Sequence, residues 1–287
     1  MKELVVVSGK GGTGKTSLVG AFAALCKNAV LADCDVDAAD LHLILQPEIQ
    51  EQHEFYGGHK AQIRPEKCNR CGKCLEVCRF EAINEFKVNS FSCEGCGVCS
   101  RACPEEAIVM AEHLSGHWFI SATPYGPLVH ARLGLAEDNS GKLVAQVRQM
   151  AKTVAFDQKK DLILTDGPPG IGCPVISAIT GADLVLVVAE PTVAGLHDLG
   201  RVLDLTAYFR IPALVCLNKW DLAPEKSEEI ETYCRERGAE VAGKIPFDVE
   251  VFKAVASGRP LVEVSQGPAA QAVQELWLKL QTRIGGD

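Results

Sequence analysis

The feature that most constrains this chain is a glycine-rich loop directly behind a short apolar strand. Residues 4–7 read Leu-Val-Val-Val, and the pattern G-x-x-x-x-G-K-[ST] follows, with an apolar helix over residues 16–27. Glycines let successive N–H groups turn toward an anion, and the helix start adds its dipole. Strand, loop and helix in this order predict a phosphate-binding loop. Its residues are Gly9, Lys10, Gly11, Gly12, Thr13, Gly14, Lys15, Thr16 and Ser17.

A second lysine, Lys10, directly follows the first glycine, so that the loop reads K-G-G-T-G-K-T. This loop resembles the deviant Walker A loop of the MinD/ParA/Mrp superfamily, which includes the nitrogenase iron protein. The resemblance implies a homodimer that binds ATP or ADP, in which Lys15 contacts the β- and γ-phosphates. It also implies that Lys10 crosses the dimer interface and offsets charge on the partner's nucleotide during hydrolysis. A solvent-exposed surface lysine is the alternative for Lys10.

Acidic residues follow two other predicted strands. Asp33 and Asp35 come after one, and Asp166 comes after the other as part of D-x-P-x-G. Acids at the carboxyl ends of parallel strands face the ligand crevice of a doubly wound sheet. The two segments resemble the switch I and switch II elements of the superfamily. The resemblance implies that Asp35 orients the attacking water, and that Thr16, Asp33 and Asp166 surround Mg²⁺.

Eight of the thirteen cysteines form two runs with one spacing, C-x2-C-x2-C-x3-C, and each run continues to Glu-Ala-Ile. This spacing resembles that of bacterial two-cluster ferredoxins, in which the fourth cysteine of each run binds the other cluster. The resemblance implies two [4Fe–4S] clusters. One set of ligands is Cys68, Cys71, Cys74 and Cys103, and the other is Cys93, Cys96, Cys99 and Cys78.

Zinc is the competing metal for these thiols. Structural zinc sites use two cysteine pairs that are well separated in sequence, whereas this chain has two runs of four. Disulfides are the other alternative, but a cytoplasmic chain keeps its thiols reduced. The spacing therefore favours clusters.

A further cysteine, Cys173, lies seven residues after Asp166 at the start of a predicted helix. A helix N-terminus lowers the pKa of a thiol. The segment resembles that of the nitrogenase iron protein, which has a cluster-binding cysteine at the same distance. We therefore hypothesise that Cys173 binds or passes on a metal or cluster, with a buried small residue as the alternative. That protein's second ligating cysteine has no counterpart between residues 121 and 142.

The base of the nucleotide is expected near a strand end that reads Asn-Lys-Trp-Asp over residues 218–221. The string N-K-x-D resembles the guanine-reading element of GTPases, whereas in MinD-like proteins the asparagine alone reads adenine. The loop with Lys10 favours ATP, and GTP stays the alternative. A later segment resembles the P-x-D element of the family. The expected base-binding residues are Asn218, Lys219, Pro246, Phe247 and Asp248.

Composition excludes several classes of protein. The net charge is −8 and the isoelectric point is about 5.5, which argues against a nucleic-acid binder. No signal peptide fits before the strand at Leu4, and no apolar run reaches the ~20 residues that span a bilayer. We expect a cytoplasmic protein. The apolar pattern over 269–284 predicts a helix packed on the sheet, and its two basic residues argue against stable membrane association.

Strands that are apolar on both faces alternate with helices, which predicts an α/β fold with a doubly wound, mainly parallel sheet. Periodicity fades between Gln46 and His59, where Pro47 and two glycines indicate a linker. Strand character returns at Trp118. We expect a P-loop ATPase domain over 1–58 and 114–287, interrupted by a small α+β ferredoxin-like insert over 59–113.

These features predict a dimeric ATPase that couples ATP binding and hydrolysis to metal-cluster assembly, or to electron delivery to a metalloprotein or cluster-carrying partner. One alternative is a MinD/ParA-type positioning or scaffold ATPase, which would need no clusters. The other is a ferredoxin-type electron carrier with a regulatory nucleotide site.

Overall fold

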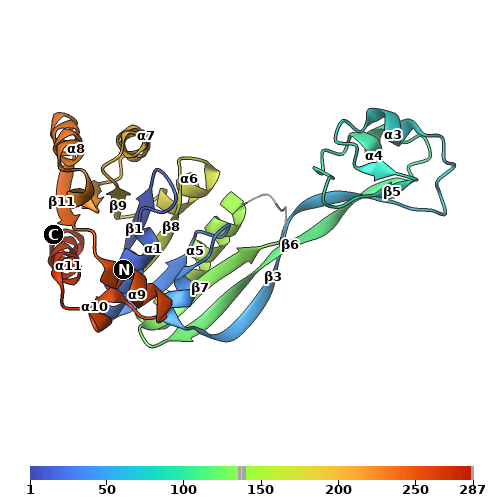
Figure 1. Ribbon diagram of the computed structural model, residues 1–287. Helices are drawn as coiled ribbons and strands as arrows, with labels where there is room; N and C mark the ends of the chain where they lie inside the picture. The colour runs from blue at the N-terminus through green and yellow to red at the C-terminus, as the bar shows by residue number, and fades with distance from the viewer. Residues whose placement is uncertain (135–136, 138–139, 286–287) are drawn as a thin grey trace. The chain divides into compact units, whose positions relative to one another are not determined.

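The computed structural model describes residues 1–134, 137 and 140–285. The chain divides into two compact units (Figure 1). The first contains residues 1–52, 118–132 and 140–287, and the second contains 53–117 and 133–139. Each unit is described by itself.

The described residues form a sheet of nine strands in the order β11-β10-β9-β1-β8-β2-β7-β6-β3. Neighbouring strands from β11 to β7 run parallel, which confirms the predicted α/β fold with a mainly parallel sheet. These parallel strands are β1 (Lys2–Ser8), β2 (Ala29–Asp33), β7 (Gly126–Leu133), β8 (Leu162–Pro169), β9 (Leu184–Ala189), β10 (Ala213–Asn218) and β11 (Glu240–Ile245).

Helices cover both faces of this sheet because the central strands are buried on both sides (Figure 1). Leu4 and Val6 point into a core shared with α1, α2 and α11, while Val5 and Val7 alternate to the face near α5, α6 and α7. The helices of this unit are α1 (Lys15–Leu25), α2 (Leu41–Leu45), α5 (Ser140–Asp157), α6 (Cys173–Ile179), α7 (Val193–Tyr208), α8 (Pro224–Glu236), α9 (Val249–Ala256), α10 (Leu261–Val264) and α11 (Pro268–Gly285), with a 3₁₀ turn at Trp220–Leu222.

The C-terminal helix α11 packs as predicted. Val273, Leu276, Trp277 and Leu280 are buried in the core beside α1, and the Trp277 ring lies 5.0 Å from that of Phe22. None of the described helices combines the length and the hydropathy needed to cross a bilayer.

The predicted linker between Gln46 and His59 is wrong for most of its length, since residues 48–63 form the strand β3 (Glu48–Ile63). Most of its side chains are exposed on both faces, so the strand carries no apolar alternation that the sequence could reveal. Pairing with β6 (Ile108–Thr123) holds it instead. The two strands lie close together at Gly57, where a side chain would lie 3.1 Å from Ser115 of β6.

The second unit contains the eight cysteines of the two runs. Besides its parts of β3 and β6, it holds two short helices, α3 (Lys73–Val77) and α4 (Val98–Ala102), and the hairpin of β4 (Ile83–Asn84) and β5 (Lys87–Val88). Its small core includes Ala61, Ile83 and Ile108 together with five of the cysteines: Cys74, Cys78, Cys93, Cys99 and Cys103. The predicted insert, 59–113, lies within this unit.

Candidate nucleotide site and cysteine sets

The phosphate loop connects β1 to α1, as the pattern predicts. Gly12 and Gly14 have φ angles of +80° and +88°, which side chains rarely adopt. A side chain at Gly14 would also lie 2.5 Å from Nδ2 of Asn218. That amide donates a 2.7 Å hydrogen bond to the carbonyl of Thr13, so the end of β10 supports the loop directly.

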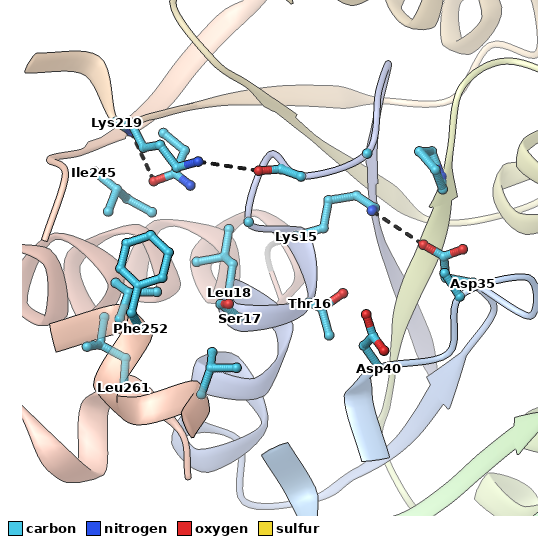
Figure 2. A pocket seen from close by; sticks show the side chains of 18 of the residues that line it. Lys15, Thr16, Ser17, Leu18, Asp35, Asp40, Lys219, Ile245, Phe252 and Leu261 are labelled. Atoms are coloured by element: carbon cyan, nitrogen blue, oxygen red, sulfur yellow. Dashed lines mark hydrogen bonds and ion pairs between the residues drawn. The ribbon is translucent and has the colours of Figure 1, made fainter. Parts of the chain in front are cut away.

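Lys15 is the first residue of α1 and is almost fully buried. Its Nζ lies 3.6 Å from Oδ2 of Asp35, a pair that Figure 2 shows beside Thr16 and Asp40. Burial raises the pKa of Asp35, and the Lys15 charge opposes that effect. Among the described residues this carboxylate is the one ion-pair partner of Lys15, so the buried lysine is suited to receive an anion at the loop.

Asp166 and Asp33 lie side by side in register on β8 and β2. The Asp33 carboxylate accepts the N–H groups of Asp35 (3.2 Å) and Leu41 (3.3 Å), so it organises the segment that follows β2. Burial first, and then the neighbouring Asp166, raise the pKa of Asp33 well above its usual value.

Asp166 is 1% exposed, and neither of its carboxylate oxygens has a hydrogen-bond partner among the described residues. Burial raises its pKa to about 6, against the opposing charge of Lys15. The Thr16 hydroxyl also lowers this pKa, but a buried carboxylate that accepts no well-formed hydrogen bond is costly unless a cation compensates its charge. Together with the Thr16 hydroxyl at the loop, this donor set fits Mg²⁺, which prefers oxygen ligands and substrate phosphates.

Lys10 lies at the other end of the loop and is held by Glu190, at the carboxyl end of β9. Its Nζ is 3.2 Å from Oε2 of Glu190, and Oε1 of the same carboxylate binds Lys219. Burial would raise the pKa of Glu190, but Lys219 and Lys10 together lower it. Lys219 also donates to the carbonyl of Gly12 at 3.3 Å.

The phosphate loop opens into a cavity of about 680 Å³, a size typical of small-molecule sites. Lys15, Thr16 and Asp35 lie at its polar end, and Ile245, Phe252 and Leu261 are apolar (Figure 2). All five of the expected base-binding residues line it: Asn218, Lys219, Pro246, Phe247 and Asp248.

The N-K-x-D string behaves differently from a guanine-reading element. Asp221 does not line the cavity; its Oδ1 accepts the N–H of Phe247 at 2.7 Å and so fastens the loop that leads to α9. Asp248 likewise caps α9 by accepting the N–H of Glu250 at 2.9 Å. The Asn218 amide is engaged at both ends, since its oxygen accepts the N–H of Lys219 at 3.0 Å.

Sequence reasoning assigned no role to Glu190 or to the apolar wall formed by Val251, Phe252 and Leu261. Glu190 follows β9 directly, as Asp166 follows β8, so the strand-end position was an available signal. The sequence offered no such signal for the apolar wall, because its residues have the pattern of apolar residues that pack short helices.

Each predicted set of four cysteines surrounds its own small cavity in the second unit. Cys68, Cys71, Cys74 and Cys103 line one, and Cys78, Cys93, Cys96 and Cys99 line the other. Hereafter these are the first set and the second set. No three His, Cys, Asp or Glu side chains of the described residues converge on a single-ion position. The thiols of each set instead enclose a space, and the fourth comes from the other run, so the donors fit a [4Fe–4S] cluster.

Cys173 is exposed and begins α6. Gly141, the second residue of α5, packs against it, and a side chain at that glycine would lie 3.2 Å from the Cβ of Cys173. The hypothesis of a buried small residue is therefore wrong for this position.

Comparison with known proteins identifies the family of the chain. The profile described as the CobQ/CobB/MinD/ParA nucleotide binding domain matches residues 4–261. The chain belongs to this family. It is thus a P-loop protein of the MinD/ParA type, in agreement with the loop and strand-end geometry above.

Three relatives of this MinD/ParA-type chain are informative. An uncharacterised protein of Methanocaldococcus jannaschii is 34% identical over 98% of this chain and 97% of its own length. An iron-sulfur cluster carrier protein of Pyrococcus furiosus is 26% identical over 50% of this chain and 53% of its own. The cell division ATPase MinD of Pyrococcus furiosus shares the fold, with a TM-score of 0.61 and 20% identity over 98% of each chain.

Proposed function

We propose that this chain is a homodimeric ATPase that carries two [4Fe–4S] clusters and uses ATP binding and hydrolysis to control cluster assembly or electron delivery to a partner metalloprotein. The observation that carries the proposal is the coexistence of two features. The buried, unpartnered Asp166 carboxylate lies beside a phosphate loop, and two enclosed sets of four thiols belong to the same chain.

At the nucleotide, Lys15 would exchange its contact with Asp35 for the phosphates. Asp35 would then be free to orient a water molecule toward the γ-phosphate, and its raised pKa suits a group that accepts a proton. Thr16 and Asp166 would hold Mg²⁺, which neutralises phosphate charge when bound. Asp33 contributes to this site chiefly through the backbone that its carboxylate holds.

Lys10 would act on the nucleotide of the partner subunit. It lies on the outside of the loop with about one third of its side chain exposed, and its contact with Glu190 keeps it within its own subunit. Dimer closure around two ATP molecules would offer it the phosphates of the partner's site instead.

ATP is the nucleotide that the site supports best. A guanine-reading aspartate would need both carboxylate oxygens to face the ring, whereas Asp221 binds the Phe247 N–H and lies off the cavity. The apolar wall near Phe252 fits a purine face of either kind, so the choice depends on Asp221.

The proposed insert 59–113, which lies within the second unit, would act as the ferredoxin-like module. The Pyrococcus furiosus relative is an iron-sulfur cluster carrier protein, which supports the proposal that this chain also handles clusters. Cys173 is proposed as an additional metal or cluster ligand because its thiol is exposed just after the switch that contains Asp166.

The test is anaerobic purification with partner capture, with and without a non-hydrolysable ATP analogue, followed by analysis of iron, sulfide and the cluster spectra. We expect about eight iron and eight sulfide per chain, and a captured metalloprotein whose yield depends on the analogue. Absence of sulfide would leave a positioning ATPase as the better function. If the cluster spectra and the captured partners do not change when nucleotide is added, a ferredoxin-type electron carrier would be the better function. A Cys173→Ser variant with unchanged metal content and partner capture would end the Cys173 hypothesis.

A further inference from the structure

The two cysteine sets have different surroundings. Lys73 lines the cavity of the first set, together with Asn69 and Glu105. The Glu105 carboxylate accepts a 3.0 Å hydrogen bond from the Asn69 amide, which offsets part of its charge. The Arg70 guanidinium lies 5.9 Å from the centre of the Phe86 ring, another lining residue, but Arg70 is exposed and does not line the cavity itself.

The second set has no lysine or arginine among the described residues that line it. Its charged neighbour is Glu94, and the rest of its lining includes Val77, Phe80 and Val98. Arg79 directly follows a cysteine of this set, but its side chain is exposed and does not line the cavity, so solvent screens its charge.

The hydrogen bonds from backbone N–H groups to the cysteine sulfurs also differ between the two sets. The N–H of Ala107 donates to Sγ of Cys103, a first-set ligand, at 3.3 Å. At the matching position, Cys78 receives no such bond from the described residues.

Adding an electron to a [4Fe–4S] cluster adds one negative charge. Nearby cations and N–H groups that bond the sulfurs stabilise the reduced form, whereas a nearby carboxylate destabilises it. Lys73 and the Ala107 N–H act in this sense on the first set. Glu105 at the first set and Glu94 at the second act in the opposite sense, so the two carboxylates do not distinguish the sets, and the difference comes from Lys73 and the Ala107 N–H.

We propose that the cluster at the first set has a higher reduction potential than the cluster at the second set. A single electron given to this unit is then found mainly on the first cluster. The inference rests on the proposed function, because it requires both clusters. When one electron moves between the sets, the second is oxidised and the first is reduced. The second set is then the electron donor and the first set the acceptor, and Lys73 is the side chain that sets this direction.

The experiment is a potentiometric titration with dithionite, followed by electron paramagnetic resonance, on the full-length protein prepared anaerobically with its clusters. We expect two reduction waves whose populations at half reduction favour one site at least tenfold, which is 59 mV for one electron. Lys73→Gln should lower the upper wave and leave the lower one in place, and Lys73→Arg should restore it. Glu94→Gln should raise only the lower wave.

Lys87→Gln is the matched control, since this exposed lysine of the same unit lines neither cavity, and it should move neither wave. Iron and sulfide contents equal to wild type show that each variant keeps both clusters. Coincident waves in the wild type, or a Lys73→Gln effect on the lower wave, overturn the inference while the proposed function stands. A protein without iron and sulfide overturns both.

Discussion

The side-chain nitrogen of Lys10 lies 3.2 Å from Oε2 of Glu190 in the same chain. The other oxygen of Glu190 binds Lys219, which in turn contacts the backbone of the phosphate loop. One carboxylate therefore holds Lys10 directly and, through Lys219, the backbone at Gly12, and Lys10 has to leave it before it can reach another subunit.

Replacement of Lys10 by alanine should separate binding from turnover. We expect Lys10→Ala to keep its affinity for ATP, because Lys15 and the loop amides remain, and to lose about 100-fold or more in hydrolysis rate. Isothermal titration and a phosphate-release assay measure the two quantities. The control is Lys27→Ala, an exposed lysine just beyond α1. Hydrolysis at the wild-type rate would rule out the role in trans.

The loop glycines should differ in their tolerance of a side chain. Gly14→Ala forces a side chain onto a φ of +88° and against Asn218, so we expect a loss of about 1–2 kcal/mol in the free energy of unfolding. Gly11→Ala meets no atom within 4 Å and has no positive φ, so its stability should stay within about 0.5 kcal/mol of wild type. Urea denaturation of the nucleotide-free proteins compares them, and equal losses would contradict this account of the loop.

A substitution at Asp221 tests whether this aspartate binds the base of the nucleotide or only supports the loop before α9. We expect ATP to bind more tightly than GTP, and Asp221→Ala to weaken both nucleotides by a similar factor, because the bond to the Phe247 N–H supports the cavity wall as a whole. Competition binding with both nucleotides measures this, with the exposed Glu228→Ala as the control. Selective loss of GTP binding would mean that Asp221 reads guanine.

His130 should make the first unit sensitive to acid. It is buried on β7, hydrogen-bonded to Ser121 at 2.9 Å and stacked on Phe119, and burial lowers its pKa from 6.5 to about 4. Between these values the unfolded chain binds a proton that the folded chain does not. Stability is therefore fully present above pH 6.5 and falls by up to about 3 kcal/mol as the pH drops toward 4.

The variant His130→Gln should flatten this part of the stability profile, measured by urea denaturation between pH 7 and 4. His197→Gln, at an exposed position on α7, is the control and should keep the wild-type slope. A His130→Gln profile that falls as steeply as wild type would assign the acid sensitivity to other groups.

Short-range pattern determined much of this protein without a structure. The loop around Lys15, the apolar strands, the acids that follow them and the spacing of the eight cysteines are all local in sequence, and each depends on chemistry that few residue types can supply. They were enough to predict the parallel sheet, the family and both four-thiol sets.

Tertiary structure decided what depends on partners distant in the chain. Glu190 contacts Lys10 across 180 positions, and Asp221 accepts the N–H of Phe247 instead of lining the cavity. Residues 48–63 became a strand through pairing with β6, although their own pattern suggested a linker. In each case the sequence states which groups exist, but only packing determines which of them meet, because burial and hydrogen-bond geometry are settled by segments that lie far apart along the chain.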